Sequence, residues 1–421
     1  MAAHIEAQSP HTMNTYGRVP IALSHGQGVR VWDINGKSYL DGLGGIAVNT
    51  LGHNHPKLVP ALQDQVSKII HSSNYYHVPN QEKLAAKLVD LSGLTNVFFC
   101  STGLEANEAA LKLARKFGHD KGITRPEIIV YEAAFHGRSM MAAALTGKVV
   151  PYKVGFGPFP AEVFHAPFPI PLHGVNVQDA LDAIQHLFKS EIEPARVAAI
   201  FLEPVQGEGG FYMAPPEFMR ALRALCDEHG ILLVADEVQT GFGRTGKWFA
   251  MDHYDVLPDL MTLAKSMAGG TNLSAITGRA EIMDAPAPGG LGGTYAGSPL
   301  GLAAAHAVID VIESEQLIAR ANALGDRLKA HLAAKRSAFP QIVDVRGPGS
   351  MIAVEFNDPA TGKPDAEFTR RVQSEARARG LILLTCGVYF NVIRFLYPLT
   401  IADATFSEAL GILDASLAAA G

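Results

Sequence analysis

Short apolar runs alternate with amphipathic segments through the middle of the chain. Ile231–Ala235 is an uninterrupted apolar run, which is typical of a strand that is covered on both faces. Similar runs recur between residues 97 and 309, in the strings VFFC, EIIVY, AAIFLEP, ILLVADE and DLMTLAK. Segments of helical periodicity separate them, among them Glu105–Phe117, Val177–Phe188 and Pro216–His229. This alternation predicts an α/β fold with a mostly parallel, doubly wound central sheet.

The pattern is different toward both ends of the chain. Residues 29–40 have alternating strand character around an Asn-Gly turn, which is a strong hairpin signal. After about residue 315 helices alternate with the apolar strings MIAVEF and LILLTC, which we interpret as strands. Helices outside the alternating region are predicted at Pro56–Ile70, Gln81–Leu91, Pro299–Glu315, Leu324–Lys335 and Phe406–Ala419. The two ends of the chain could therefore form one small α+β domain beside a large one.

Composition narrows the class of protein. With 421 residues, of which 48% are hydrophobic and 18% charged, the chain predicts a globular protein of two or more domains. A net charge of −6 provides no basic face for nucleic acid. The three cysteines lie far apart, which fits reduced thiols better than disulfides or a metal site.

Targeting segments are not evident. The N-terminal string MAAHIEAQSPHTMNTYGR has no apolar core of a secretory signal. The uncharged stretch Ala285–Ile309 is rich in proline and glycine, so we interpret it as a loop entering a helix and not as a membrane span. We expect a soluble, cytoplasmic protein that binds neither membranes nor nucleic acid.

An aspartate and a lysine follow two of the predicted strands. Asp236 ends the apolar run of the string ILLVADE, and Lys265 follows the string LPDLMTLA. Open α/β sheets place their ligands at the carboxyl ends of the strands. There a lysine can form a Schiff base and an aspartate can keep a pyridinium nitrogen protonated, the pair that pyridoxal phosphate chemistry requires. Each residue alone is weak evidence, because charged side chains are mostly ordinary surface groups.

The string DEVQTGFGRTG and its spacing to AKS closely resemble the class III aminotransferases, the ω-aminotransferase group of fold-type-I enzymes that depend on pyridoxal phosphate. The resemblance runs from about Gly17 to about Ala418. It implies a large domain over residues 54–318 with the mostly parallel sheet. It also implies a smaller α+β domain built from both termini, residues 1–53 and 319–421. Pyridoxal 5'-phosphate is the implied cofactor, and no metal is expected.

The implied phosphate site lies where a predicted strand turns into a helix. The string VFFCSTGLEANEAALKLARKFG predicts a strand, a tight turn and a helix from near Leu104, whose first N–H groups can bind an anion. Gly103 lets the backbone approach a phosphate, and Thr102 can add a hydroxyl. Many relatives have serine or alanine where this chain has Leu104, so we expect the amides of Gly103 and Leu104 to bind. The resemblance also implies a second phosphate contact from Thr294, in the string GGTYAG, which would reach the phosphate bound by the other subunit of a homodimer.

The resemblance also implies how the cofactor ring is held. Asp236 would pair with the ring N–H, Val238 would lie under one ring face, Phe135 would stack over the other, and Gln239 would reach the phenolic oxygen. Lys265 would bind the cofactor covalently, which requires a neutral amine and hence a lowered pKa. Its released amine would then be the base of the proton shift.

Four further residues are implied to contact substrates. Arg138, in FHGR, resembles the arginine that binds a distal carboxylate, for which a planar guanidinium with two parallel hydrogen bonds is well suited. Arg394 resembles the arginine that takes the α-carboxylate of glutamate. Glu208 matches the glutamate that closes on that arginine when a donor without an α-carboxylate is bound. Ile46 would line the pocket, although an apolar residue could equally be plain core.

Different parts of the chain resemble two different subfamilies. From Met13 to about Gly122 it resembles acetylornithine aminotransferases, with the strings NTYGRVPIALSHG and IIHSSNYYHVPNQ. From about Leu145 onward it resembles 4-aminobutyrate aminotransferases, with LTGKVVPYKVGFGPFP and LILLTCGVYFNVIRFLYPLTI. The second part carries Glu208, Lys265 and Arg394, so it receives more weight in the choice between the two subfamilies.

The predicted reaction moves the terminal amine of an ω-amino acid of the 4-aminobutyrate type to 2-oxoglutarate, giving an aldehyde and glutamate. The alternatives are an acetylornithine aminotransferase and a broad ω-transaminase that uses pyruvate. A mutase or decarboxylase is a rival of the same fold, and a noncatalytic protein that binds the cofactor or interacts with partners is a rival of another class. The expected assembly is a homodimer with shared active sites, or a tetramer.

Overall fold

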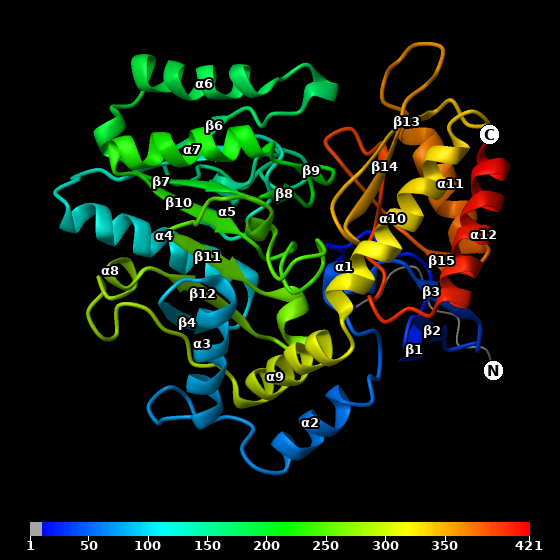
Figure 1. Cartoon of the computed structure of the whole chain (residues 1–421), viewed down its shortest axis with the longest axis horizontal. Coiled ribbons are helices and arrows are strands. Elements are labelled where there is room, and N and C mark those ends of the chain that lie inside the picture. The colour runs from blue at the N-terminus through cyan, green and yellow to red at the C-terminus, as the bar shows by residue number, and fades with distance from the viewer. Residues whose placement is uncertain (1–10) are drawn as a thin grey trace.

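A seven-stranded sheet forms the centre of the computed structural model, which describes residues 11–421 (Figure 1). Of its strands, β12 alone is antiparallel to its neighbours β11 and β4, and the other pairs are parallel. The prediction of a mostly parallel sheet is therefore confirmed. In order across the sheet the strands are β4 (Asn96–Cys100), β12 (Ser274–Gly278), β11 (Leu260–Leu263), β10 (Leu232–Asp236), β7 (Val197–Leu202), β5 (Glu127–Tyr131) and β6 (Val163–Ala166).

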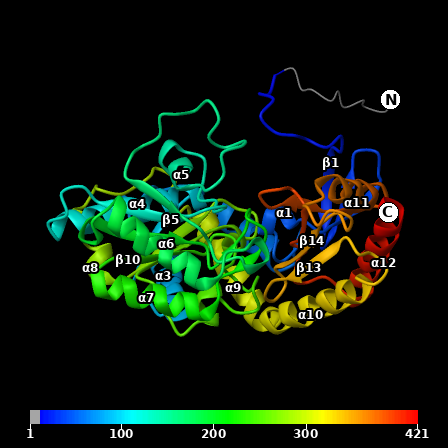
Figure 2. The same ribbon diagram turned by 90° about the horizontal axis from the view of Figure 1, so that it is seen from above.

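Helices cover both faces of this sheet, which explains its uninterrupted apolar strands. Every residue of β5, β7, β10, β11 and β12 is buried. Successive side chains of a strand point to opposite faces. Accordingly, Val130 packs with α4 (Gly103–Asp120), whereas Tyr131 belongs to the cluster with α6 (Val177–Ser190) and α7 (Pro216–His229) (Figure 2).

The N- and C-terminal segments share a second region (Figure 1). One sheet has the order β1-β2-β3-β15 and so joins both ends of the chain, and another has the order β13-β14-β17-β16. The boundaries of the domains at residues 53 and 318 stay predictions. The strands are β1 (Leu23–Gln27), β2 (Arg30–Asp33), β3 (Ser38–Asp41), β13 (Ile342–Arg346), β14 (Ile352–Phe356), β15 (Leu381–Ile382), β16 (Leu384–Cys386) and β17 (Val392–Phe395), and their helices are α10 (Leu317–Lys335), α11 (Ala366–Ala378) and α12 (Asp403–Ala420).

The predicted strand LILLTC is wrong as a single element. Its first part, β15, pairs with β3, and its second part, β16, pairs with β17 of the other sheet. Leu383 stands between them and is buried in the core that these sheets share. The sequence stays apolar through this change of sheet, from Leu381 to Leu384, so the pattern resembled one strand. The predicted hairpin at residues 29–40 is confirmed, with Trp32 opposite Ser38.

The remaining α-helices and strands connect these sheets. They are α1 (Gly44–Ala47), α2 (Leu58–Val66), α3 (Pro79–Ser92), α5 (Met140–Leu145), α8 (Ala280–Met283), α9 (Pro299–Ser314) and the short pair β8 (Val205–Gln206) and β9 (Tyr212–Met213). The stretch 285–309 is a loop entering α9, as predicted. Within residues 11–421, no helix combines the length and apolarity needed to cross a membrane. The prediction about a secretory signal rests on a string whose first ten residues lie outside the described part.

Two helix-interior glycines give a matched test of the packing. A Cβ on Gly325 of α10 would overlap the backbone carbonyl of Gly349, whereas a Cβ on Gly411 of α12 would meet nothing within 4 Å. Gly325→Ala should lower the free energy of unfolding by about 3 kcal/mol or more, because backbone must move. Gly411→Ala should be neutral or stabilising by up to about 1 kcal/mol. Scanning calorimetry measures both; equal melting temperatures for the two variants would contradict this packing.

Candidate active site

A cavity of about 440 Å³ opens at the carboxyl ends of strands β4, β10 and β11. The start of α4, the loop after β5, the loop after β10 and the turn after β11 all contribute to its wall. The structure thus brings together nine of the residues predicted from sequence, namely Thr102, Gly103, Leu104, Phe135, Arg138, Asp236, Val238, Gln239 and Lys265. The other four, Ile46, Glu208, Thr294 and Arg394, do not line this cavity of the single chain.

Asp236 is a buried carboxylate held by three donors. Its oxygens accept hydrogen bonds from the backbone N–H of Val238 (3.0 Å) and the side-chain amide of Asn107 (2.8 Å), and one lies 2.7 Å from Nδ1 of His136. Burial alone would raise the pKa of Asp236, but the hydrogen bond and charge of His136, with the other donors, bring it below its usual value. The carboxylate is therefore ionised at neutral pH.

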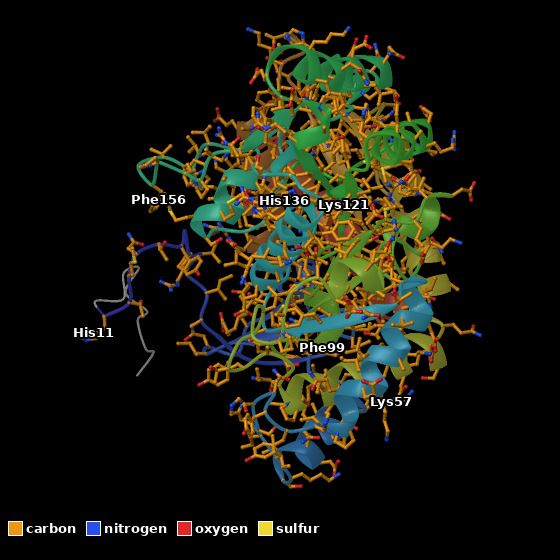
Figure 3. The ribbon with its side chains drawn as sticks, turned by 90° about the vertical axis from the view of Figure 1, so that its left-hand side faces the viewer. His11, Lys57, Phe99, Lys121, His136 and Phe156 are labelled. Carbon is orange, nitrogen blue, oxygen red and sulfur yellow. The ribbon has the colours of Figure 1, made fainter. Side chains whose placement is uncertain are left out.

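Sequence reasoning missed His136 and Asn107. The amide of Asn107 donates both to Asp236 and to the backbone carbonyl of His136 (2.9 Å), and its oxygen accepts from the Thr262 hydroxyl (2.8 Å). Burial lowers the pKa of His136, but Asp236 outweighs burial and the net shift is upward. Figure 3 shows His136 inside the body of the molecule, while Phe156 stands on a projecting loop. Both missed residues lay within strings that were recognised, but nothing in their spacing showed that they meet Asp236.

Lys265 lies just beyond β11, in a backbone conformation with φ 45° that side chains rarely adopt. Burial lowers the pKa of its amine below the ordinary value; the charge of Glu208 opposes this shift and that of Arg394 adds to it. A neutral amine, the form that attacks carbonyl groups, is thus more accessible here than on an exposed lysine. The lowered pKa agrees with what the sequence analysis expected.

The start of α4 has free capacity for an anion. The Thr102 hydroxyl accepts from the Glu105 N–H (3.2 Å), and the Glu105 carboxylate accepts from the N–H groups of Ser101 (2.7 Å) and Thr102 (3.0 Å). The N–H groups of Gly103 and Leu104 come next, in the first turn, where no intrahelical partner is available. These two amides and the Thr102 hydroxyl hydrogen can bind a phosphate.

Gly103 is required for a reason beyond approach of a phosphate. A Cβ at this position would lie 2.8 Å from Cγ1 of Val238, which is closer than real Cβ atoms come to a neighbour. The start of α4 and the loop after β10 are therefore packed directly against each other. This contact fixes the turn before α4 relative to Asp236.

Arg394 and Glu208 form a bidentate ion pair beside the cavity. The two guanidinium nitrogens of Arg394 lie 2.6 and 3.0 Å from the two carboxylate oxygens of Glu208. Arg394, on β17, is 2% exposed. One of its nitrogens also lies 3.5 Å from the side-chain oxygen of Gln239, which lines the cavity. Burial would raise the pKa of Glu208, but Arg394 lowers it, so both partners are charged.

Arg138 is a second cation in the cavity wall, and its surroundings are different. In the described part of the chain it forms no ion pair with a carboxylate. Its guanidinium carbon lies 4.8 Å from the ring centre of Tyr152 and 5.9 Å from that of Phe135. Aromatic faces hold a guanidinium without consuming its hydrogen-bonding capacity. Tyr152 was not among the predicted residues.

Ile46 and Thr294 do not line the cavity of the single chain. Ile46 is 37% exposed and has φ 66°, so it is not a core residue. Thr294 is an exposed residue of the loop that precedes α9. Its contribution to a second subunit's site stays a prediction.

Comparison with known proteins agrees with this geometry. The family model for aminotransferase class III matches residues 12–417. The chain belongs to the class III aminotransferases, a family of enzymes that depend on pyridoxal phosphate. The predictions of family, enzyme class and cofactor are therefore confirmed.

Individual relatives are similar over almost the whole chain. The 4-aminobutyrate aminotransferase GabT of Escherichia coli strain K12 is 49% identical over 94% of this chain and 92% of its own. The 5-aminovalerate aminotransferase DavT of Pseudomonas putida is 49% identical over 94% and 93%. Acetylornithine aminotransferase 1 of Bordetella parapertussis is 42% identical over 92% and 96%. A crystal structure of an amine transaminase from an uncultivated Pseudomonas species, in its cofactor-bound form, has TM-score 0.89 and 30% identity over 98% of each chain.

The position of Lys265 leads to a direct chemical test. Borohydride reduction of the holoenzyme, followed by peptide mapping, should place the pyridoxyl group on Lys265. Lys265→Ala should abolish turnover, since both the covalent attachment and the base are lost, although the cofactor can still bind noncovalently. A pyridoxyl group on any other lysine of the wild-type enzyme would contradict the assignment.

Proposed function

We propose that this enzyme transfers the terminal amino group of an ω-amino acid of the 4-aminobutyrate type to 2-oxoglutarate, giving an aldehyde and glutamate. The observation that carries the proposal is the bidentate pair of Arg394 and Glu208, together with an Arg138 that has no acidic partner within residues 11–421. One arginine is thus available to a distal carboxylate at all times. The other is available only when Glu208 moves away.

We infer that the cavity described above holds pyridoxal phosphate. The Gly103 and Leu104 amides and the Thr102 hydroxyl suit the phosphate, and Phe135 and Val238 provide apolar surfaces for the ring. The ionised Asp236 suits a ring N–H, and Gln239 suits the phenolic oxygen. When bound, the cofactor supplies an electron sink for the carbanion that forms at the donor's amine-bearing carbon. Lys265 moves the proton to and from that carbon as general base and acid.

The switch between the two substrates follows from their carboxylates. An ω-amino acid has one remote carboxylate, which Arg138 binds through two parallel hydrogen bonds. Such a donor has no second carboxylate for Arg394. Glu208 therefore stays paired with Arg394 and neutralises its buried charge. Glutamate and 2-oxoglutarate carry a second carboxylate, which takes the place of Glu208 on Arg394. One cavity then serves both half-reactions in turn.

The relatives favour this donor class over the alternatives. Two enzymes named for 4-aminobutyrate or 5-aminovalerate are 49% identical to this chain, and one named for acetylornithine is 42% identical. We therefore place acetylornithine second as a donor. Pyruvate is the alternative acceptor. Family membership and an intact set of Lys265, Asp236 and both arginines argue against a noncatalytic protein.

We propose a homodimer that works in the cytoplasm. Ile69, Ile70, Tyr75, Tyr76 and Tyr295 are large apolar side chains that the single chain leaves exposed, and they offer a surface for a second copy. Thr294 is next to Tyr295 and would reach the partner's phosphate. The free, buried cysteines Cys100, Cys226 and Cys386 suit a reducing compartment.

Separate measurement of the two half-reactions tests both donor and switch. Stopped-flow traces of the wild-type holoenzyme should show rapid reaction with 4-aminobutyrate and 5-aminovalerate, and slower reaction with acetylornithine and β-alanine. The aminated enzyme should react with 2-oxoglutarate faster than with pyruvate. A preference for acetylornithine in the first half-reaction would overturn the proposed donor.

The variants Arg394→Ala and Glu208→Ala should then affect the half-reactions unequally. Arg394→Ala should harm the glutamate half-reaction more, because the α-carboxylate loses its partner. Glu208→Ala should harm the ω-amino acid half-reaction more, because Arg394 is left unpaired. Removing one member of a buried ion pair costs roughly 3–5 kcal/mol, which is easily visible in such rates. Equal losses in both half-reactions for both variants would mean that the ion pair has only a structural role, which would contradict the switch.

A further inference from the structure

Glu203 is a buried carboxyl group in the cavity wall for which the mechanism above has no use. It follows β7 directly and is 5% exposed. One of its oxygens accepts the N–H of Phe135 at 3.0 Å, and the other accepts the N–H of Gly207 at 3.0 Å. One side chain therefore joins two loops that are far apart in the sequence.

Each of these loops leads to one of the two substrate-binding arginines. Phe135 is three residues before Arg138 and belongs to the same loop after β5. The carbonyl of Gly207 lies 3.4 Å from a guanidinium nitrogen of Arg394, and the next residue is Glu208. A chain of contacts thus runs from the Arg138 loop through Glu203 and Gly207 to Arg394.

The ionised form of Glu203 is the form that accepts both N–H groups fully. Burial raises the pKa of Glu203 to about 7, against the lowering effect of His136 and the two N–H donors, while Asp236 adds to the rise. Burying a carboxylate is costly unless hydrogen bonds and nearby charges compensate, and here the two N–H donors and His136 provide that compensation. A simple spacer between the loops could have been apolar.

We propose that Glu203 is a positioning residue that sets the separation between the Arg138 site and the Arg394 site, and thereby the length of dicarboxylate that the enzyme accepts. This inference rests on the proposed function, since it takes both arginines as carboxylate sites. One methylene changes the span of a diacid by roughly 1 Å, a displacement that can cost about 10²-fold when groups must be aligned. A rigid tie between the loops is therefore sufficient to discriminate neighbouring chain lengths.

Removing the tie should shift the loops without unfolding them. Glu203→Gln keeps the shape, but the amide has one acceptor oxygen and presents its NH₂ group to the other N–H. The same loops remain joined elsewhere, because the Gln206 amide donates to the Glu132 carbonyl at 2.8 Å. The expected effect is an altered separation of the two arginines and not a loss of structure.

Glu237 provides a matched control. It is 0% exposed, burial raises its pKa to about 7, and its carboxylate accepts the Met251 N–H at 2.7 Å and the Thr240 hydroxyl. It is not among the described residues that line the cavity. Glu237→Gln therefore removes a comparable buried carboxylate without touching either loop.

Titration calorimetry of the holoenzyme with the unreactive diacids glutarate and adipate tests the proposal without relying on turnover. Wild-type enzyme should bind glutarate, which has the length of 2-oxoglutarate, more tightly than adipate. In Glu203→Gln the ratio of the two Kd values should change by about tenfold or more, and in Glu237→Gln it should stay close to wild type. If Glu203→Gln fails to fold, Glu203→Asp, which is too short to reach both N–H groups, should give the same change.

The outcomes separate this inference from the proposed function. A folded Glu203 variant with the wild-type Kd ratio would overturn the role of the tie. An equal change in Glu237→Gln would also overturn it, since any buried carboxylate would then do. A wild-type enzyme that binds neither diacid would instead overturn the assignment of Arg138 and Arg394, and with it the proposed reaction.

Discussion

The site is organised around one buried negative charge, that of Asp236. Its strand, β10, lies in the middle of the sheet and brings the carboxylate to the edge where the cavity opens. Such a charge is stable in a buried position only when it is paired and hydrogen-bonded. His136, Asn107 and the Val238 N–H meet that need, and each belongs to a different segment of the cavity wall. The hydrogen bonds that stabilise the Asp236 carboxylate therefore also fix the loop of Phe135, the start of α4 and the loop of Val238.

The substrate side depends on a contrast between two arginines. Arg394 is buried and neutralised by Glu208, whereas Arg138 rests on aromatic rings and keeps its hydrogen-bonding capacity. A buried ion pair contributes little to stability in general, because desolvation offsets its attraction. In the proposed reaction, a competing carboxylate opens this pair. Glu203 links the loops of the two arginines. In our proposal, the same pair of loops therefore distinguishes substrates both by their carboxylates and by their length.

Much of the fold and part of the site could be predicted from the sequence. The apolar runs located the central strands, and Asp236 and Lys265 were recognisable because they follow such runs within long motifs. Roles of the arginines and of Glu208 came from resemblance. His136, Asn107 and Glu203 were not found, because their importance comes from hydrogen bonds between distant segments. The division of LILLTC between two sheets was missed because the sequence stays apolar from Leu381 to Leu384 across the change.

The ionised state of Asp236 is the central claim, and the variant Asp236→Asn tests it most directly. An amide keeps the size of the side chain but cannot hold a ring nitrogen protonated. With cofactor content and melting temperature equal to wild type, the first half-reaction with the preferred donor should slow by about 10²-fold or more. A near-normal rate at full cofactor occupancy would contradict the account and leave Asp236 as a structural residue.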